Sequence, residues 1–460
     1  MEAEIAQYRA AGQPVYIEEF NAALDAVPDD LNAAVLYEKA ISVLNMSLPS
    51  GVGIEGFMDE PSLFERDMAS AEALFMQNAE TLALIREARG RSNVAWSDRL
   101  DPINPPLNMM GGQRNISRLL WFSAGYQVHR GNHAEAIENL HDFFAFTDAI
   151  IAHPTLLAQL VGWACDHLAV SWLEAFGTRL NYCTEDTEVG CVGRDQVDAL
   201  ILRLQNEERI QTTFSHSLIG ERAYAIGFIQ HMVTVTKWFD RALFGPIDTL
   251  ETLRYSNDVA HLRELIAEAY LHSVNRNLGG RTVRESFVRR LARPYSDFYW
   301  DSRDRSTNVV SLLYSTLARR RIAVVALAIL QFRADVGNYP ESLEVLVPLY
   351  LASLPIDPFS ATDEPLKYKA WTTDGPLLYS VWEDGKDDGG TPRKPQTRLG
   401  DIVFYLEGAP ALQRKTSLHS ETITTAIPMT AAGRTMRIKT AATAHKQGTA
   451  KANQTVRDFS

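Results

Sequence analysis

The segment RRRIAVVALAILQFRADVGNYP, residues 319–340, decides how this chain is built. It is the centre of a longer stretch, residues 307–336, in which basic and apolar residues alternate before an almost wholly apolar run. Gly337 and then Pro340 follow, and these residue types end helices. The pattern predicts one long helix over residues 307–336.

The chain after this helix has a different character. A short helix is expected over residues 342–347, and prolines punctuate residues 355–359. Three short runs of strand-forming residues follow, at 366–370, 377–381 and 402–406. Strands of this length fit a small antiparallel sheet that packs on the long helix.

The chain before the long helix reads as helices with short polar breaks. Residues 31–44 carry apolar side chains at i, i+3 and i+4, with Asp30 as the expected N-cap. A hairpin of two helices is expected over residues 117–151 around Gly131, and it is similar to a single tetratricopeptide (TPR) repeat. The remaining expected elements are helices at 63–88, 155–180, 194–239 (broken), 257–275 and 281–293, and a loop at 97–112. The fold class is therefore α+β, mostly α-helical, with the small sheet at the end.

Composition restricts the partners of the chain. It has 460 residues and a formal net charge of -12, so nucleic acid is not expected as the main partner, because phosphate binding needs clustered Lys and Arg. No stretch reaches the roughly 18 to 20 apolar residues that span a bilayer, and the acidic start lacks a signal sequence. We expect a soluble chain as written. Residues 408–460 are basic and poor in large apolar residues, which predicts a disordered tail.

An ordered series of motifs between residues 310 and 406 resembles the major pseudopilin of type II secretion. These motifs are GNYPESLEVL (337–346), PIDPF (355–359), LKY (366–368), LYSVWEDGKDDGG (378–390) and GDI (400–402). The resemblance implies a long helix on a small antiparallel sheet, closed by a loop that binds calcium. Two departures from the family pattern are Trp382, where a glycine is usual, and the insertion at 391–399.

Three earlier motifs, DLNAAVLY (30–37), SRLL (117–120) and GERA (220–223), resemble a family of uncharacterised planctomycete-type bacterial proteins. Members join a helical region to a pseudopilin-like end. The resemblance implies a helical scaffold domain (1–300), a pseudopilin-like α+β domain (301–407) and a basic tail (408–460), in the bacterial cell envelope or on its periplasmic side. The membrane-anchoring helix that begins most members is absent from this sequence. Either it has been removed or the chain is soluble, and a cytoplasmic location stays open.

The closing loop is the place where ligand-type residues concentrate. Asp384, Asp387, Asp388 and Asp401 supply carboxylates, and neighbouring glycines supply bends. Calcium takes six to eight oxygen ligands from a chain that surrounds it, and this many acids without a cation would repel one another. We expect these four aspartates to hold calcium. The alternative is a solvated acidic turn.

Other candidate residues have simpler interpretations. His129, His133 and His141 lie on the predicted hairpin without a metal motif, so we expect surface or capping roles. Glu221 is expected to pair with an arginine of a neighbouring helix and not to form an acid–base pair with His216.

The three cysteines form no metal or redox motif. Cys183 and Cys191 would close a small loop in an oxidising compartment, but two separate thiols are the simpler interpretation. Cys165 lies in an apolar helical run and is expected to be buried.

The sequence therefore favours a non-enzymatic, envelope-associated scaffold that binds a protein partner. Its pseudopilin-like end module would be stabilised by calcium. Because some three hundred residues precede that module, we do not expect a filament subunit. The competing hypothesis is a hydrolase or small-ligand-binding protein with a pocket between the helices, which convergent His, Asp, Glu or Ser side chains in a deep pocket would favour.

Overall fold

The structure is a computed structural model of the chain. It describes residues 2–101, 109–183, 190–242, 309–393 and 399–408. The helices expected at 257–275 and 281–293, and the tail expected after residue 408, lie outside the described residues.

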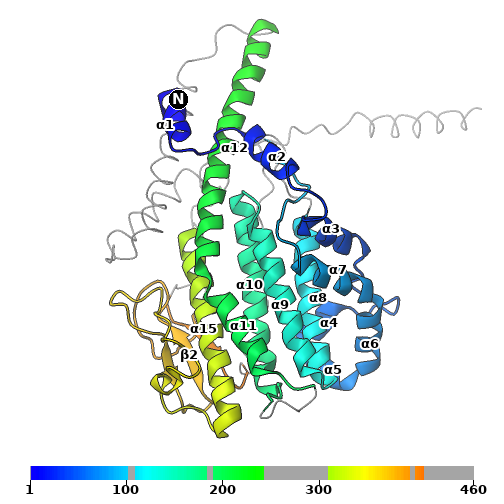
Figure 1. Ribbon diagram of the computed structural model, residues 1–460, viewed down its shortest axis with the longest axis vertical. Coiled ribbons are helices and arrows are strands. Elements are labelled where there is room, and N and C mark those ends of the chain that lie inside the picture. The colour runs from blue at the N-terminus through cyan, green and yellow to red at the C-terminus, as the bar shows by residue number, and fades with distance from the viewer. Residues whose placement is uncertain (1, 102–108, 184–189, 243–308, 394–398, 409–460) are drawn as a thin grey trace, which may run out of the picture.

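The described chain is mostly helical with one small antiparallel sheet, which confirms the predicted α+β class (Figure 1). The first helices are α1 (Glu2–Ala10), α2 (Ile17–Asp25), α3 (Ala33–Val43), α4 (Ile54–Asp59), α5 (Leu63–Arg66), α6 (Met68–Gln77) and α7 (Ala79–Arg89). Next come α8 (Met110–His129), α9 (His133–Ile151), α10 (Leu156–Phe176), the 3-10 turn η1 (Gly177–Arg179), α11 (Arg194–Gln205) and α12 (Glu207–Ala242). The last elements are α15 (Val309–Val336), the 3-10 helix η2 (Leu343–Leu346), and strands β1 (Lys367–Lys369), β2 (Leu377–Ser380) and β3 (Ile402–Tyr405).

The start of α3 is fixed by Asn32 and not by Asp30, so the predicted N-cap was wrong. Asn32 Oδ1 accepts hydrogen bonds from the backbone N–H groups of Ala34 (3.0 Å) and Ala95 (2.9 Å). Its Nδ2 donates to the Ala95 carbonyl oxygen at 2.8 Å. Asp30 is exposed in the preceding turn. A buried Asn32 therefore caps the helix and ties it to a distant loop.

The single helix predicted over residues 63–88 is three helices, α5 to α7. Asp67 begins α6 by accepting a hydrogen bond from the Ser70 N–H at 3.2 Å. Asn78 separates α6 from α7, and its buried side chain exchanges hydrogen bonds with the Asn45 backbone. Side chains that bond to nearby backbone compete with helix continuation, which explains both breaks.

The helical core is built on α8, α9 and α10. Helices α8 and α9 form the hairpin predicted around Gly131, α10 packs beside both, and α3 and α7 cover the other side (Figure 1). Large aromatic residues of these three helices are buried in the core, namely Trp121, Phe122, Phe143, Phe144, Trp163, Trp172 and Phe176. Helix α8 begins at Met110, earlier than the predicted end of the loop at 112.

Helix α15 confirms the long helix that was predicted over residues 307–336 from the pattern around residues 319–340. Every residue from Ile322 to Leu330 is at most 4% exposed. A helix that is apolar all round is buried all round. One side of α15 packs on α10 and α11, and the other packs on β2, β3 and η2 (Figure 1).

The sheet has the order β1-β2-β3 with both pairs antiparallel. Leu378 pairs with Phe404, and both lie in the core that contains α15. Leu377, Tyr379 and Tyr405 form a small separate cluster. The strands are one or two residues shorter than predicted.

A single hydrophobic cluster joins the helical region to the end of the chain. It includes residues from α3 to Leu406, with α15 in its middle. The boundary predicted at residue 300 lies outside the described residues. Packing within the described residues therefore gives no separation between the helical region and the sheet.

Cys183 and Cys191 form a disulfide, with their Cα atoms 5.2 Å apart, so the interpretation as separate thiols was wrong. The Cys183 N–H donates to the Val192 carbonyl, which aligns the two ends of the loop. The Gly190 carbonyl accepts from the first two N–H groups of α9. The loop thus caps α9. Cys165 is buried, as predicted.

One described helical stretch, residues 156–179, is long and apolar enough to cross a membrane by length and composition. It is α10 with its 3-10 turn, and 61% of its most apolar window is buried inside the protein. Core helices of soluble proteins pass the same test, so this stretch is weak evidence for a membrane span.

Candidate functional site

The closing loop, residues 381–401, contains the four aspartates predicted to bind calcium. Asp384 and Asp387 each accept a hydrogen bond from an N–H two residues later, at 3.1 and 2.9 Å. Asp388 and Asp401 instead join the two ends of the insertion. Asp388 Oδ2 accepts from the Gly400 N–H at 3.0 Å, and Asp401 Oδ2 accepts from the Gly390 N–H at 2.7 Å. The structure therefore brings Asp388 and Asp401 together across the insertion.

Asp401 is the buried member of the four aspartates. It is 1% exposed, and burial raises the pKa of its carboxyl to about 6. The nearby Asp388 and Asp387 carboxylates add to the rise in this pKa, while the Gly390 and Asp388 N–H groups oppose it. Its Oδ1 is buried and makes no hydrogen bond of normal geometry. A buried carboxylate oxygen of this kind is suited to a cation.

The observed arrangement is not a completed metal cage. Among the residues that the structure describes, no three His, Cys, Asp or Glu side chains converge to hold a metal ion. The aspartates face backbone N–H groups along the loop, with Asp387 and Asp388 close enough to Asp401 to influence its pKa. Asp401 Oδ1 is the feature that fits a bound cation.

Asp357 is a structural residue of this region that the sequence reasoning missed. Its carboxylate accepts hydrogen bonds from the Phe359 N–H, the Ser380 hydroxyl and the Val381 N–H, at 2.7–2.9 Å. It is 2% exposed. This carboxylate therefore fastens the proline-rich segment to the end of β2, just before the closing loop. The position of Asp357 within the PIDPF motif (355–359) was the sequence signal that could have identified this residue.

Trp382 occupies a backbone conformation that favours glycine. Its φ is 48°, in the left-handed region. The indole is 5% exposed, and the Arg393 guanidinium lies 5.1 Å from its ring centroid. The loop thus makes a turn at Trp382 without a glycine, and side-chain packing offsets the strain.

Two of the three hairpin histidines, His129 and His141, make structural contacts. His129 Nδ1 lies 2.9 Å from the Gly125 carbonyl oxygen, and its ring stacks on Phe64. His141 Nε2 lies 3.2 Å from the Gln196 carbonyl oxygen, so it links α9 to α11. Burial lowers the pKa of His133 and of His141. The described histidines, cysteines and carboxylates form no metal group here.

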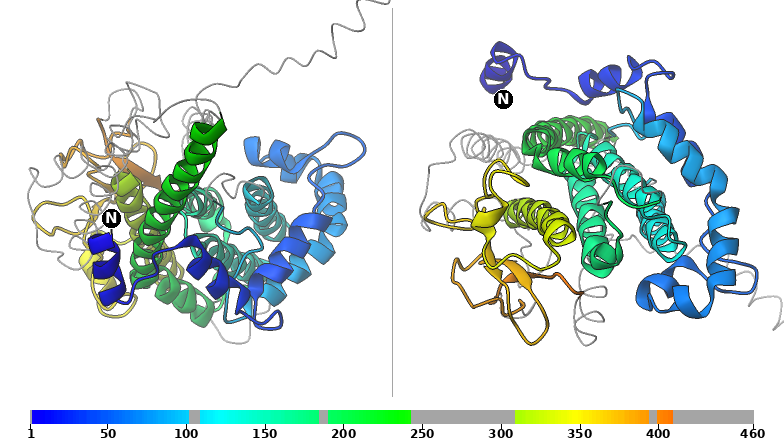
Figure 2. Two further views of the ribbon diagram at one scale, coloured as in Figure 1. Left: turned by 90° about the horizontal axis from the view of Figure 1, so that it is seen from above. Right: turned by 60° about the horizontal axis from the view of Figure 1, so that its bottom comes forward.

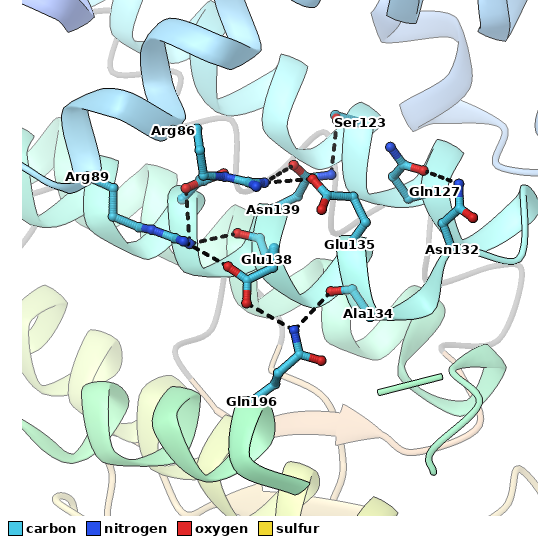
Figure 3. A network of polar contacts seen from close by, with 11 residues as sticks. Arg86, Arg89, Ser123, Gln127, Asn132, Ala134, Glu135, Glu138, Asn139 and Gln196 are labelled. Carbon is cyan, nitrogen blue, oxygen red and sulfur yellow. Dashed lines mark hydrogen bonds and ion pairs between the residues drawn. The ribbon is translucent and has the colours of Figure 1, made fainter. Parts of the chain in front are cut away.

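A polar network joins α7 to α9 (Figure 3). Arg86 on α7 binds Glu135 at 2.8 Å and also reaches Asp142. Arg89, one turn later, binds Glu138 at 2.8 Å and Asp142 at 3.1 Å. Burial is the main cause of the raised pKa of Asp142, which both arginines oppose. All these charges face each other between helices, so the network holds α7 on α9.

A second network surrounds Arg320 in the middle of α15. The guanidinium is 3% exposed and binds Asp166 of α10 through two nitrogens, at 2.6 and 2.9 Å. It also reaches Asp148 of α9 at 3.3 Å, and Asp148 binds Arg203 of α11. Nearby carboxylates raise the pKa of Arg320 despite its burial. Four helices therefore meet at one buried ion-pair group.

The GERA motif (220–223) lies where α12 crosses the turn between α9 and α10. Gly220 permits this approach, because a Cβ there would lie 1.9 Å from the Pro154 carbonyl oxygen. Glu221 Oε1 accepts a hydrogen bond from the Leu156 N–H at 2.8 Å, at the start of α10. Burial raises the pKa of Glu221 to about 7, which that N–H opposes. The predicted ion pair of Glu221 with an arginine was wrong.

His216, the other member of the rejected acid–base pair, packs its ring against Phe20, with centroids 5.3 Å apart. Arg222 faces away from Glu221, toward the N-terminal residues, and Ala223 is buried against Ile17 and Phe20. The motif therefore joins three segments that are distant in the sequence. Only the tertiary structure shows this.

Comparison with models of protein families, with curated proteins and with solved structures finds no match to this chain.

Proposed function

We propose that the protein is a non-enzymatic scaffold of the bacterial cell envelope, with a pseudopilin-like end module that calcium stabilises. The observation that carries this proposal is the end of the chain: α15 packs on a three-stranded antiparallel sheet that an acidic loop closes. The α8–α9 hairpin, which is similar to one TPR repeat in sequence, suits the helical region to protein contacts.

Calcium is the cation that the closing loop suits. Asp401 would hold the ion through its buried Oδ1, and Asp384, Asp387 and Asp388 would supply further oxygens. A bound cation would also remove the repulsion among these carboxylates. Its contribution to function is stiffness, because it would tie residues on both sides of the insertion.

The test is thermal denaturation of the full chain with calcium, magnesium or a chelator. Calcium at a hundredfold excess over Kd stabilises by about 2.7 kcal/mol, and magnesium, which requires tight octahedral geometry, substitutes poorly. Asp401→Asn keeps the shape and removes the charge, so it should abolish most of the calcium effect. Asp363→Asn, at an exposed position outside the loop, is the matched control. Identical curves in all three solutions would contradict calcium binding.

The disulfide supports the envelope setting, since disulfides persist in oxidising compartments such as the periplasm. The test is thiol alkylation in intact bacteria, followed by mass spectrometry of the peptides around Cys183 and Cys191. Both cysteines should resist alkylation until a reductant is added. Alkylation of both without reductant would place the protein in a reducing compartment.

A filament role is not part of this proposal. The apolar helix α15 is covered on one side by α10 and α11 and on the other by the sheet and η2. No described face of its central turns is left for a neighbouring subunit. The module therefore serves as a fixed end piece of a scaffold.

A further inference from the structure

Arg222 holds the N-terminal residues against α12. We name residues 8–16 the N-terminal strap. The Arg222 guanidinium donates to Gln13 Oε1 at 2.8 Å and to the Pro14 carbonyl oxygen at 2.7 Å. It lies over the Tyr8 ring, 3.6 Å from the centroid. Arg222 is 0% exposed, and the strap contributes to this burial through Tyr8, Gln13 and Pro14.

This buried cation has neutral partners only. Among the residues that the structure describes, no carboxylate lies within ion-pair distance of Arg222, and its Nε is buried without a hydrogen bond. Burial lowers its pKa. By contrast, the buried Arg320 binds Asp166, and the largely buried Arg321 binds Glu207. A buried charge without a counter-ion is costly, so the Arg222 site is incomplete in charge.

The strap itself is lightly attached. Val15 and Tyr8 form a small cluster with Ile226 of α12, apart from the main core. Glu19 of α2 binds the Val15 N–H and Arg9 and forms no ion pair with Arg222. Figure 2 shows α1 at the edge of the molecule, joined to α2 by an extended segment. The strap therefore contacts α12 through a small cluster that is separate from the main core.

We propose that the strap is an exchangeable internal ligand, and that Arg222 takes an acidic peptide segment from a protein partner. The partner places a carboxylate where the Gln13 amide oxygen lies and an aromatic ring over the guanidinium. Charge complementarity favours this occupant, because a carboxylate supplies the counter-ion that the strap lacks. The inference rests on the proposed scaffold role for the existence of a partner. Its test involves neither calcium nor the cell envelope, so this inference and the proposed function can be refuted independently of each other.

The experiment measures binding of two fluorescent peptides to the full chain by fluorescence anisotropy. Both have the sequence of residues 5–17, IAQYRAAGQPVYI, and one carries Gln13→Glu. The tethered strap competes at an effective concentration of order mM, so the unchanged peptide should bind weakly. The acidic peptide should bind at least tenfold more tightly, and Arg222→Gln in the chain should remove this difference.

A second variant tests the proposal if Arg222→Gln does not fold. Gln13→Glu in the chain supplies the counter-ion internally, so it should reduce binding of the acidic peptide at least tenfold. Equal affinity of the two peptides would overturn the proposal and would indicate strap exchange between copies. Unchanged binding of the acidic peptide to the Gln13→Glu chain would also overturn it.

Discussion

Glu221 makes the stability of the protein depend on pH near neutrality. Its carboxylate is enclosed where α12 meets the start of α10, and burial raises its pKa from 4.5 to about 7. A raised pKa in the folded state means that the folded protein binds the proton more tightly than the unfolded chain does. The stabilisation is therefore complete below pH 4.5 and is lost as pH rises through 7.

The size of the effect follows from the two pKa values. At about 1.4 kcal/mol for each pH unit that separates them, the contribution is about 3 kcal/mol. Glu221→Gln removes the titration and keeps an oxygen that accepts the Leu156 N–H. We expect the variant and the unchanged protein to be about equally stable at pH 4.5. At pH 8 the variant should be more stable by about 3 kcal/mol.

The assay is urea denaturation of both proteins at several pH values between 4.5 and 8, with Glu208→Gln as the control. Glu208 is exposed on the same helix, and its substitution also replaces one glutamate by glutamine. The nearby Tyr224 has its pKa raised to about 12 and does not titrate in this range. A stability difference for Glu221→Gln that stays constant with pH would refute the reasoning.

Further substitutions test individual contacts by equilibrium denaturation. Arg320→Met leaves Asp166 buried without its counter-ion and should lower the free energy of unfolding by about 3–5 kcal/mol. Adding Asp166→Leu to this variant should recover most of that loss. A double variant no more stable than Arg320→Met would contradict the buried ion pair. Gly220→Ala forces α12 away from the Pro154 carbonyl and should destabilise, whereas Gly111→Ala, where a Cβ meets nothing within 4 Å, should stabilise by about 0.5–1 kcal/mol. Asn32→Ala should cost about 2 kcal/mol through the lost cap and loop contacts.

The long helix and the sheet were predictable because their signals are local. Residues 319–340 carry an apolar run that only a buried helix satisfies, followed by Gly and Pro, and the strands stand out by composition. The hairpin around Gly131 was predictable for the same reason. The three-way split of residues 63–88 was not, because Asp67 and Asn78 interrupt the helix through contacts that a periodic pattern does not contain.

The partners of buried charges required the tertiary structure. Arg319, Arg320 and Arg321 are alike in sequence, yet Arg320 binds Asp166 and Arg321 binds Glu207, because successive helical positions face different neighbours. Glu221 was assigned an arginine partner and instead caps α10. In the closing loop, Asp401 accepts a hydrogen bond from the Gly390 N–H across the insertion, a contact that links residues eleven positions apart. No sequence pattern indicates that the Asp384 and Asp387 carboxylates accept hydrogen bonds from nearby N–H groups.

The position of α15 has a mechanical consequence. This helix packs on both the sheet and the helical bundle, and its Arg320 binds Asp148 of α9 and Asp166 of α10 directly. A mechanical force applied to the sheet is therefore transmitted to the helical bundle through α15. Anything held by the closing loop would keep a constant angle to the α8–α9 hairpin. The described part of the chain therefore behaves as one rigid unit and not as two independently moving domains.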